Sequence, residues 1–298
     1  MSLSIKNILA ALCLGIAFVP ANAVVKTVAS ADSLAFPLTD VIYTSVDSAE
    51  VVKLLREECG NDDVIYYARR LRGRPYAMHT LEIADPEKLV VNLSALDCTT
   101  LVETVCALAL TKRQKADNFA AYCRNLESLR YWNGRRDGYC SRLHYFTWWI
   151  FDNKERGKIE EVNDSNCFVM PVQVNNYYMS RYPQRYKFLK GNSVRVQEIR
   201  QLEKKFNGAD GFYLPKSKTG LSRKHLSFIK DGDVIAIVTS KSGLDYSHLG
   251  FAVWGKDDRL HLLNASMVKG RVVEDTQTLK SYLYRYGHTK GIKVLRLK

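Results

Sequence analysis

The stretch NLSALDCTTLVETVCALAL, residues 92–110, determines how the rest of the chain is interpreted. Its apolar residues recur at helical spacing, which predicts a helix that begins close to Cys98. The apolar stripe consists of Leu101, Val102, Val105, Leu108 and Ala109. Cys98 extends this stripe at its N-terminal end, and the preceding Asp97 is a residue type that caps helices.

Two interpretations of Cys98 are open. Cysteine is often a small buried hydrophobic residue, and it would then only complete the stripe. A helix N-terminus also carries free amides and positive partial charge, which favour a thiolate and can hold an oxyanion. Cys98 is therefore a candidate nucleophile at the rim of whatever packs on this helix.

The segments around this helix predict an α+β fold, with helices in the first half and a mainly antiparallel sheet afterwards. Further helices are expected at 47–60, 61–73, 115–132 and 194–206, from apolar spacing and from Asn and Gly at their ends. Strands are expected at 234–238, 249–254, 260–263 and 292–297.

A base for the thiol is found near the start of one of these strands. His248 precedes the apolar run Leu249–Trp254, so a helix N-terminus could face a sheet edge there, as a thiol–imidazole pair requires. The following strand offers His261 and Asn264 to orient the imidazole. These two positions lie on opposite faces of the strand: a five-residue turn selects Asn264 and a four-residue turn selects His261.

Several motifs together resemble the NlpC-type cell-wall peptidases, which are papain-like cysteine hydrolases of bacterial peptidoglycan. The likeness is closer to the N-acetylmuramoyl-L-alanine amidase-like branch, and it runs from about residue 60 to the C-terminus. The motifs are RGRPYAMHTLE (72–82), LDCTTLVE (96–103), SRLHYF (141–146), DGDVIAIV (231–238), YSHLGFAV (246–253) and LLNAS (262–266).

The resemblance implies a papain-like fold in which Cys98 is the nucleophile and His248 the general base. Asn264 occupies the position of the third catalytic residue, where His is commoner, and its amide would orient the imidazole without the charge of a carboxylate.

Five further residues are expected to bind substrate. Tyr76 could hydrogen-bond the substrate near the nucleophile, or it could simply pack in a Pro-Tyr turn. Glu82 could bind an amine or amide of the substrate, or it could be a solvated acid. Arg142 could bind a stem-peptide carboxylate through its planar fork, and His144 and Ser247 are expected near the cleft.

The first 23 residues resemble a secretory signal peptide. Lys6 precedes an apolar run from Ile8 to Val19, and Ala21-Asn22-Ala23 forms the cleavage site. The run is too short to span a bilayer stably, although a retained anchor is an alternative. A periplasmic or secreted protein without a further transmembrane segment is expected, and nothing in the sequence predicts its oligomeric state.

The predicted organisation is a signal peptide at 1–23, an irregular lead-in at 24–46 and one papain-like domain at 47–298. Helical insertions are expected around 113–230. Cleavage leaves six scattered cysteines without a CxxC pair, which argues against zinc, and no cofactor is expected. Some of them could form disulfides, with Cys123 and Cys140 as one candidate pair.

The net charge is +13, of which signal cleavage removes one lysine. A cytosolic protein of this charge would suggest nucleic acid, but the signal peptide favours an anionic cell wall, and no nucleic-acid partner is expected. The predicted function is a cysteine amidase that cuts the bond between N-acetylmuramic acid and L-alanine in peptidoglycan or muropeptides. The alternatives are cleavage of the γ-D-glutamyl–diamino acid bond by the same fold, and a non-catalytic wall-binding protein.

Overall fold

The computed structural model of the chain describes residues 36–298, which cluster as one compact unit. The predicted signal peptide and the first part of the predicted lead-in lie outside the described residues. The remainder of the lead-in is not irregular throughout. It contains a short 3-10 helix, η1 (Leu38–Asp40), and strand β1 (Val41–Ile42), and α1 begins at Ser45.

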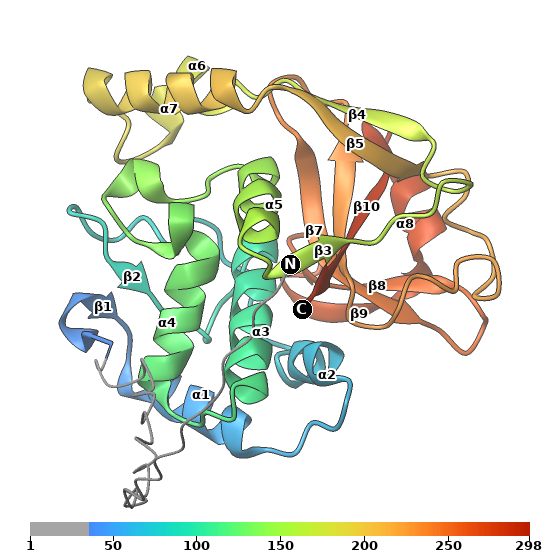
Figure 1. The fold of residues 1–298 in the computed structure, drawn as a ribbon, viewed down its shortest axis with the longest axis horizontal. Coiled ribbons are helices and arrows are strands. Elements are labelled where there is room, and N and C mark those ends of the chain that lie inside the picture. The colour runs from blue at the N-terminus through green and yellow to red at the C-terminus, as the bar shows by residue number, and fades with distance from the viewer. Residues whose placement is uncertain (1–35) are drawn as a thin grey trace, which may run out of the picture. The chain divides into compact units, whose positions relative to one another are not determined.

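Five helices form the first half of the described chain and gather on one side of the sheet (Figure 1). They are α1 (Ser45–Arg56), α2 (Asp63–Arg70), α3 (Cys98–Arg113), α4 (Phe119–Arg130) and α5 (Phe146–Glu155). The first four correspond to predicted helices. Helix α5 was not predicted, because its aromatic run FTWWIFDNKE is buried on most sides and has no polar stripe that would reveal helical periodicity.

The helix that carries Cys98 lies inside the protein. Residues Thr100–Thr111 of α3 are all buried, so the predicted single apolar stripe is in fact a helix packed on all sides. Glu103 is therefore buried, and its carboxylate accepts a hydrogen bond from Arg130 at 2.6 Å. A charged residue on the inner side of a helix is tolerated only with such a partner.

The sheet is antiparallel throughout, in agreement with the predicted α+β fold. Its order is β4-β5-β10-β6-β7-β8-β9, and β3 pairs with β10 outside this path. The strands are β3 (Ile159–Glu161), β4 (Met170–Val174), β5 (Gly208–Pro215), β6 (Val234–Thr239), β7 (Tyr246–Trp254), β8 (Leu260–Ser266), β9 (Arg271–Thr278) and β10 (Thr289–Leu297). A separate parallel pair joins β1 to β2 (Leu89–Val90).

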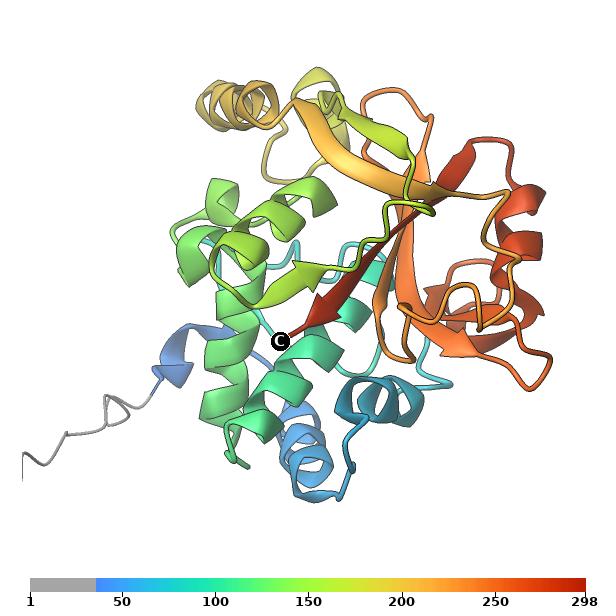
Figure 2. The same cartoon turned by 45° about the vertical axis from the view of Figure 1, so that its right-hand side comes forward.

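Both faces of the sheet are covered. One face packs with α3 and its neighbours in the larger core, and α3 contacts both β7 and β8. The opposite face packs on α8 (Leu279–Arg285) in a second core (Figure 2). Strand β6 is consequently buried at every position, which explains its continuous apolar sequence VIAIVT.

The predicted helical insertion around 113–230 is only partly helical. It contains α6 (Tyr178–Arg181) and α7 (Ser193–Lys205), but also the three strands β3, β4 and β5. The same range also contains α4, α5 and the short 3-10 helices η2 (Trp132–Gly134), η3 (Tyr139–Ser141) and η4 (Pro183–Arg185). Strands β4 and β5 were missed because β4 contains Pro and β5 contains Gly, Asp and Pro, which normally argue against a strand. Strand β3 has only three residues, too few to show an alternating pattern.

Two further observations concern cysteines and membranes. The proposed pairing of Cys123 with Cys140 is wrong, because all six cysteines in residues 36–298 are free thiols. Cys123 is buried within α4, whereas the Cys140 sulfur contacts the carbonyl oxygen of Arg195 at 3.8 Å. Within the same residues, none of the helices combines the length and the apolar character needed to cross a bilayer.

Candidate active site

Cys98 is the first residue of α3, and a capping box fixes the start of this helix. The Asp97 side chain accepts a hydrogen bond from the Thr100 amide at 2.8 Å, and the Thr100 hydroxyl accepts one from the Asp97 amide at 2.9 Å. The cap occupies the Thr100 amide, so the amides of Cys98 and Thr99 are the first-turn donors that remain near the sulfur.

The Cys98 sulfur meets the strand that carries His248. The backbone amide of Leu249, the next residue after His248, lies close enough to this sulfur to favour its thiolate, as do the Thr99 hydroxyl and the amide of Cys98 itself. Cys98 and His248 are both partly exposed and line the same hollow of about 210 Å³. The structure thus brings the helix N-terminus and the sheet edge together.

The surroundings of this pair favour uncharged groups. Burial, reinforced by the neighbouring Asp97 carboxylate, raises the pKa of the Cys98 thiol to about 12, although the Leu249 amide, the Thr99 hydroxyl and the Cys98 amide oppose this shift. Burial likewise lowers the pKa of His248 below its usual 6.5, although the Asn264 hydrogen bond and Asp97 oppose this shift. The helix N-terminus was expected to favour a thiolate, but desolvation has the larger effect on the pKa of Cys98 and favours the thiol.

Asn264 holds the His248 ring. Its Oδ1 lies 2.9 Å from His248 Nε2, and its Nδ2 donates to the Leu262 carbonyl at 3.4 Å. Because the amide nitrogen is the donor toward Leu262, Oδ1 is the acceptor toward His248, and Nε2 carries the proton. The unprotonated Nδ1 is then available as a base.

The turn between β7 and β8 accounts for this pairing. It spans the five residues 255–259, and Val253 pairs with His261 across the hairpin. Asn264 therefore shares a face with His248, whereas His261 points to the other face. His261 bonds the Asp275 carbonyl and the Asp257 carboxylate, each at 3.1 Å, and does not contact His248.

Gly250 lets Asn264 reach the imidazole. Gly250 follows His248 by two residues on β7 and faces Asn264 of β8. A Cβ at this position would be 3.0 Å from Asn264 Cβ and 2.6 Å from the Leu263 carbonyl oxygen. A glycine inside a strand is typical of such a close approach. The glycine inside the apolar strand YSHLGFAV is a signal of this close approach that the sequence already contains.

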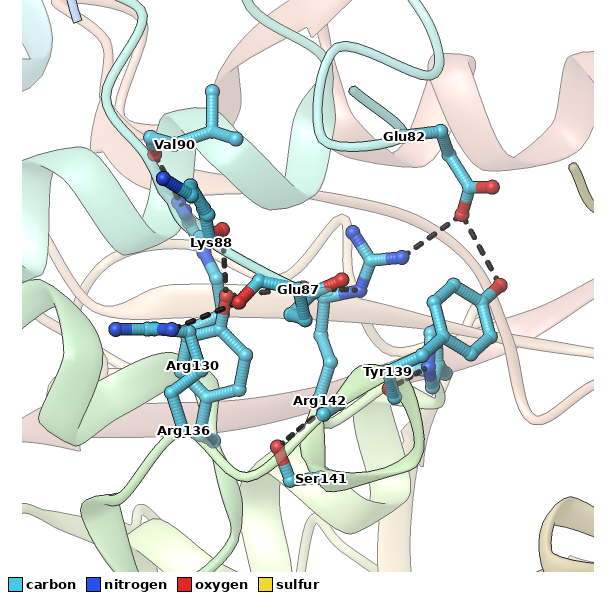
Figure 3. A network of polar contacts seen from close by, with 12 residues as sticks. Glu82, Glu87, Lys88, Val90, Arg130, Arg136, Tyr139, Ser141 and Arg142 are labelled. Carbon is cyan, nitrogen blue, oxygen red and sulfur yellow. Dashed lines mark hydrogen bonds and ion pairs between the residues drawn. The ribbon is translucent and has the colours of Figure 1, made fainter. Parts of the chain in front are cut away.

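A polar network supports the loop on the other side of the cleft (Figure 3). Glu82 lines the hollow beside Cys98 and a second hollow of about 250 Å³ next to it. Its Oε1 accepts hydrogen bonds from Arg142 at 2.8 Å and from the Tyr139 hydroxyl at 3.1 Å. Its Oε2 is buried without a partner in the described part of the chain, so a substrate donor could bind there.

Arg142 differs most from its expected role. The residue is 5% exposed, and its guanidinium lies between Glu82 and Glu87, with Nε 3.6 Å from Glu87 Oε1. Tyr131 also donates to Glu87, at 3.0 Å, and burial raises the pKa of Glu87 against the opposing charge of Arg142. The Arg142 guanidinium, which was expected to bind a stem-peptide carboxylate, is therefore already paired with Glu82 and Glu87.

The other predicted substrate residues lie around the cleft. Tyr76 is half-buried, and burial, with Cys98 and Asp97 adding to it, raises the pKa of its phenol to about 12. His144 lines both hollows and bonds the Tyr139 carbonyl at 2.9 Å. Ser247 lines the hollow beside Cys98 as well as a third one on the other side of His248.

Two residues of the site were not predicted. His79 lines both hollows and adopts a φ of +61°, which is uncommon for a residue other than glycine and is often found at functional sites. The Tyr282 ring stacks on His248, with centroids 6.0 Å apart and planes 20° apart. Tyr282 belongs to α8, so only the tertiary fold brings it to the imidazole.

No metal site accompanies these residues. Within 36–298, no group of three or more His, Cys, Asp or Glu side chains is arranged to hold a metal ion. The chemistry that this arrangement can perform is nucleophilic attack by a sulfur, with an oriented imidazole to move the proton.

Comparisons with known proteins identify the family to which the chain is similar. The model of the AmiA-like family, described as N-acetylmuramoyl-L-alanine amidase-like, matches residues 66–289. A crystal structure of an N-acetylmuramoyl-L-alanine amidase from Bacteroides uniformis is 38% identical, with a TM-score of 0.74, and the match covers 79% of this chain and 98% of that one. No match to a curated protein sequence was found.

Two other solved structures are similar. A proposed xylanase from Bacteroides fragilis is 38% identical, with a TM-score of 0.73, over 78% of this chain and 100% of that one. A protein from Legionella pneumophila is 23% identical, with a TM-score of 0.63, over 84% of this chain and 94% of that one. The last shows similarity of fold alone.

Proposed function

Because the chain belongs to the AmiA-like, N-acetylmuramoyl-L-alanine amidase-like family, we propose that it is a cysteine amidase acting on peptidoglycan or muropeptides. The observation that carries this proposal is that Cys98, at the start of α3, and His248 line the same hollow, where Asn264 orients the imidazole. Family membership supports the amidase class, and this geometry supports the cysteine mechanism.

The first half of the reaction forms a thioester. The Cys98 thiol gives its proton to His248 Nδ1 while the sulfur attacks the carbonyl carbon of the scissile amide. The Cys98 amide at the start of α3 is placed to stabilise the resulting oxyanion. Collapse of this intermediate breaks the C–N bond, and the imidazolium returns the proton to the leaving amine.

The second half restores the enzyme. His248 takes a proton from water, which attacks the thioester carbonyl, and the sulfur leaves with the proton that the imidazolium returns. The products are a carboxylic acid and the thiol enzyme, so no cofactor is consumed. Asn264 keeps the ring in one tautomer throughout both halves.

The finer classification as a papain-like enzyme of the NlpC type is part of this proposal. A nucleophile at a helix N-terminus, packed against an antiparallel sheet that carries His248 and Asn264, supports it. We also propose a one-domain organisation, which rests on the order of the motifs. A periplasmic or secreted location is proposed from the N-terminal sequence.

The scissile bond that we favour is the one between N-acetylmuramic acid and L-alanine. The name of the Bacteroides uniformis relative supports this bond over the γ-D-glutamyl–diamino acid bond. Glycosidase chemistry fits less well, because a pair of free carboxylates is usual there and Glu82 and Glu87 both engage Arg142.

The test is mass spectrometry of purified muropeptides after incubation with the parent protein. Release of free stem peptide and an unsubstituted muramic acid is expected, whereas a truncated peptide on the sugar would identify the endopeptidase. Cys98→Ser should abolish turnover. Cys167→Ser, which changes another partly exposed thiol, is the matched control and should retain activity. Undiminished turnover by Cys98→Ser would refute the cysteine mechanism.

A further inference from the structure

We propose that a ridge of tyrosines and cations beside the cleft binds the carboxylates of the peptide half of the substrate. The ridge consists of residues 177–190, which form α6, η4 and the segment after them. This inference rests on the proposed function, since it assigns a place to one part of a muropeptide.

The ridge carries charge without counter-ions. From residue 165 to residue 197 the sequence contains no Asp or Glu, but it contains Arg181, Arg185, Lys187, Lys190 and Arg195. Arg195 is paired with Asp85 at 2.7 Å. Arg181, Arg185 and Lys190 are exposed, and none of them forms an ion pair with any residue of 36–298.

The acid that lies under the ridge does not neutralise it. Glu203 of α7 is 2% exposed, and its Oε1 accepts hydrogen bonds from the Tyr145 hydroxyl at 2.7 Å and from the Ser180 amide at 3.1 Å. This carboxylate is directed into the protein. The guanidinium groups at the surface therefore remain available to an anion from outside.

Tyrosine rings hold the two guanidinium groups in place. Arg181 lies over the ring of Tyr177 at 5.6 Å, and Arg185 lies over the rings of Tyr178 at 5.5 Å and Tyr182 at 5.4 Å. Arg185 also donates through Nη1 to the Tyr178 hydroxyl. Stacking on a ring restricts the side chain and leaves the remaining N–H groups at the edge of the guanidinium for an anion. An Arg fixed in this way loses less entropy when it binds a carboxylate bidentately.

The ridge is continuous with the proposed active site. Met179 and Tyr186 line the same hollow as Cys98 and His248. The Lys187 ammonium donates to the Glu82 carbonyl at 3.2 Å, and the Tyr177 and Tyr178 amides both donate to Gly243, five residues before His248. The ridge therefore forms part of the wall of the hollow that Cys98 and His248 line.

The peptide half of a muropeptide is the occupant with matching chemistry. It begins at the amine that is released when the scissile amide bond breaks, and it carries the carboxylates of D-glutamate and of its C-terminus. Arg142 lines the second hollow, but Glu82 and Glu87 already bind it. The cations of the ridge that form no ion pair within residues 36–298 are therefore better placed than Arg142 to bind the peptide carboxylates.

Calorimetry with Cys98→Ala tests this inference without turnover. The two probes are N-acetylmuramoyl-L-alanyl-D-glutamate and its diamide, which have the same size and differ only in charge. The diacid should bind about tenfold more tightly, and added salt should reduce the difference. Adding Arg181→Gln and Arg185→Gln should remove the preference, and Arg181→Lys with Arg185→Lys should retain part of it.

The matched control is Lys216→Gln with Lys280→Gln, because these two cations also lie over a tyrosine ring, that of Tyr284. It should keep the full preference. Equal binding of the two probes, or a preference that survives Arg181→Gln with Arg185→Gln, overturns the inference. Binding of phosphatidylglycerol vesicles through these arginines without a preference for the diacid would assign the ridge to membranes instead.

The two proposals can fail separately. If Cys98→Ala prefers the diacid but the parent protein cleaves no muropeptide, the amidase proposal is refuted and carboxylate binding by the ridge is supported. Cleavage of both probes by the parent at equal kcat/KM, without a binding preference, would refute the ridge and leave the amidase standing.

Discussion

Replacing Asn264 tests the proposed catalytic geometry at its least obvious residue. Asn264 is completely buried, and Oδ1 accepts the hydrogen bond from His248 Nε2 at 2.9 Å. Asn264→Ala leaves this N–H unpaired and frees the ring to turn away from Cys98. Loss of a partner in a buried hydrogen bond costs about 1–3 kcal/mol, so kcat/KM should fall about 5- to 150-fold.

The pH dependence separates orientation from a general loss of structure. The Asn264 hydrogen bond opposes the burial that lowers the pKa of His248. Removing it should lower this pKa further, and the acid limb of kcat/KM should move to lower pH because the base stays neutral there. Asn264→Asp places a carboxylate beside the ring and should move the same limb to higher pH.

The assay is release of peptide from purified muropeptides, followed by chromatography between pH 4 and pH 9. His261→Gln is the matched control, because His261 is the other polar residue of the same strand and bonds Asp257 and Asp275 instead. It should change kcat/KM less than about twofold. A folded Asn264→Ala protein with parental kcat/KM, or an equal loss in His261→Gln, would refute the orientation argument.

Two further predictions concern packing. Gly250→Ala should lower both Tm and activity, because the new Cβ would lie 2.6 Å from the Leu263 carbonyl oxygen. Calorimetry and the muropeptide assay measure the two effects, and an unchanged Tm would contradict this prediction. Arg130→Ala should reduce the free energy of unfolding by about 3–5 kcal/mol, because it leaves Glu103 buried without its partner. Urea unfolding measures this loss, and Arg56→Ala, which removes an exposed ion pair, should cost less than about 1 kcal/mol.

The local part of the site could be predicted from the sequence. The apolar spacing after Asp97 placed the helix that begins at Cys98, and the alternation of strand residues narrowed the third position to His261 or Asn264. Both signals lie within a few residues of the group they position, which is why sequence alone could detect them. The sequence left the length of the turn open, and the structure shows five residues, which selects Asn264.

The charged surroundings could not be predicted in the same way. Arg142 belongs to a motif that suggested substrate binding, but its partners Glu82 and Glu87 lie more than fifty residues earlier in the chain. Tyr282 likewise reaches His248 only because α8 packs on the sheet. Such contacts depend on how distant elements pack, and neither periodicity nor residue type encodes that packing.

Burial determines the resting state of the proposed catalytic pair. Burial raises the pKa of Cys98 and lowers that of His248, so both shifts favour the uncharged forms of the two groups. A neutral pair would transfer the proton from sulfur to imidazole during attack on the substrate. An uncharged Asn264 suits such a pair, because it orients a neutral ring without stabilising the imidazolium in advance. A carboxylate in its place would favour the ion pair that burial disfavours, at the cost of another buried charge.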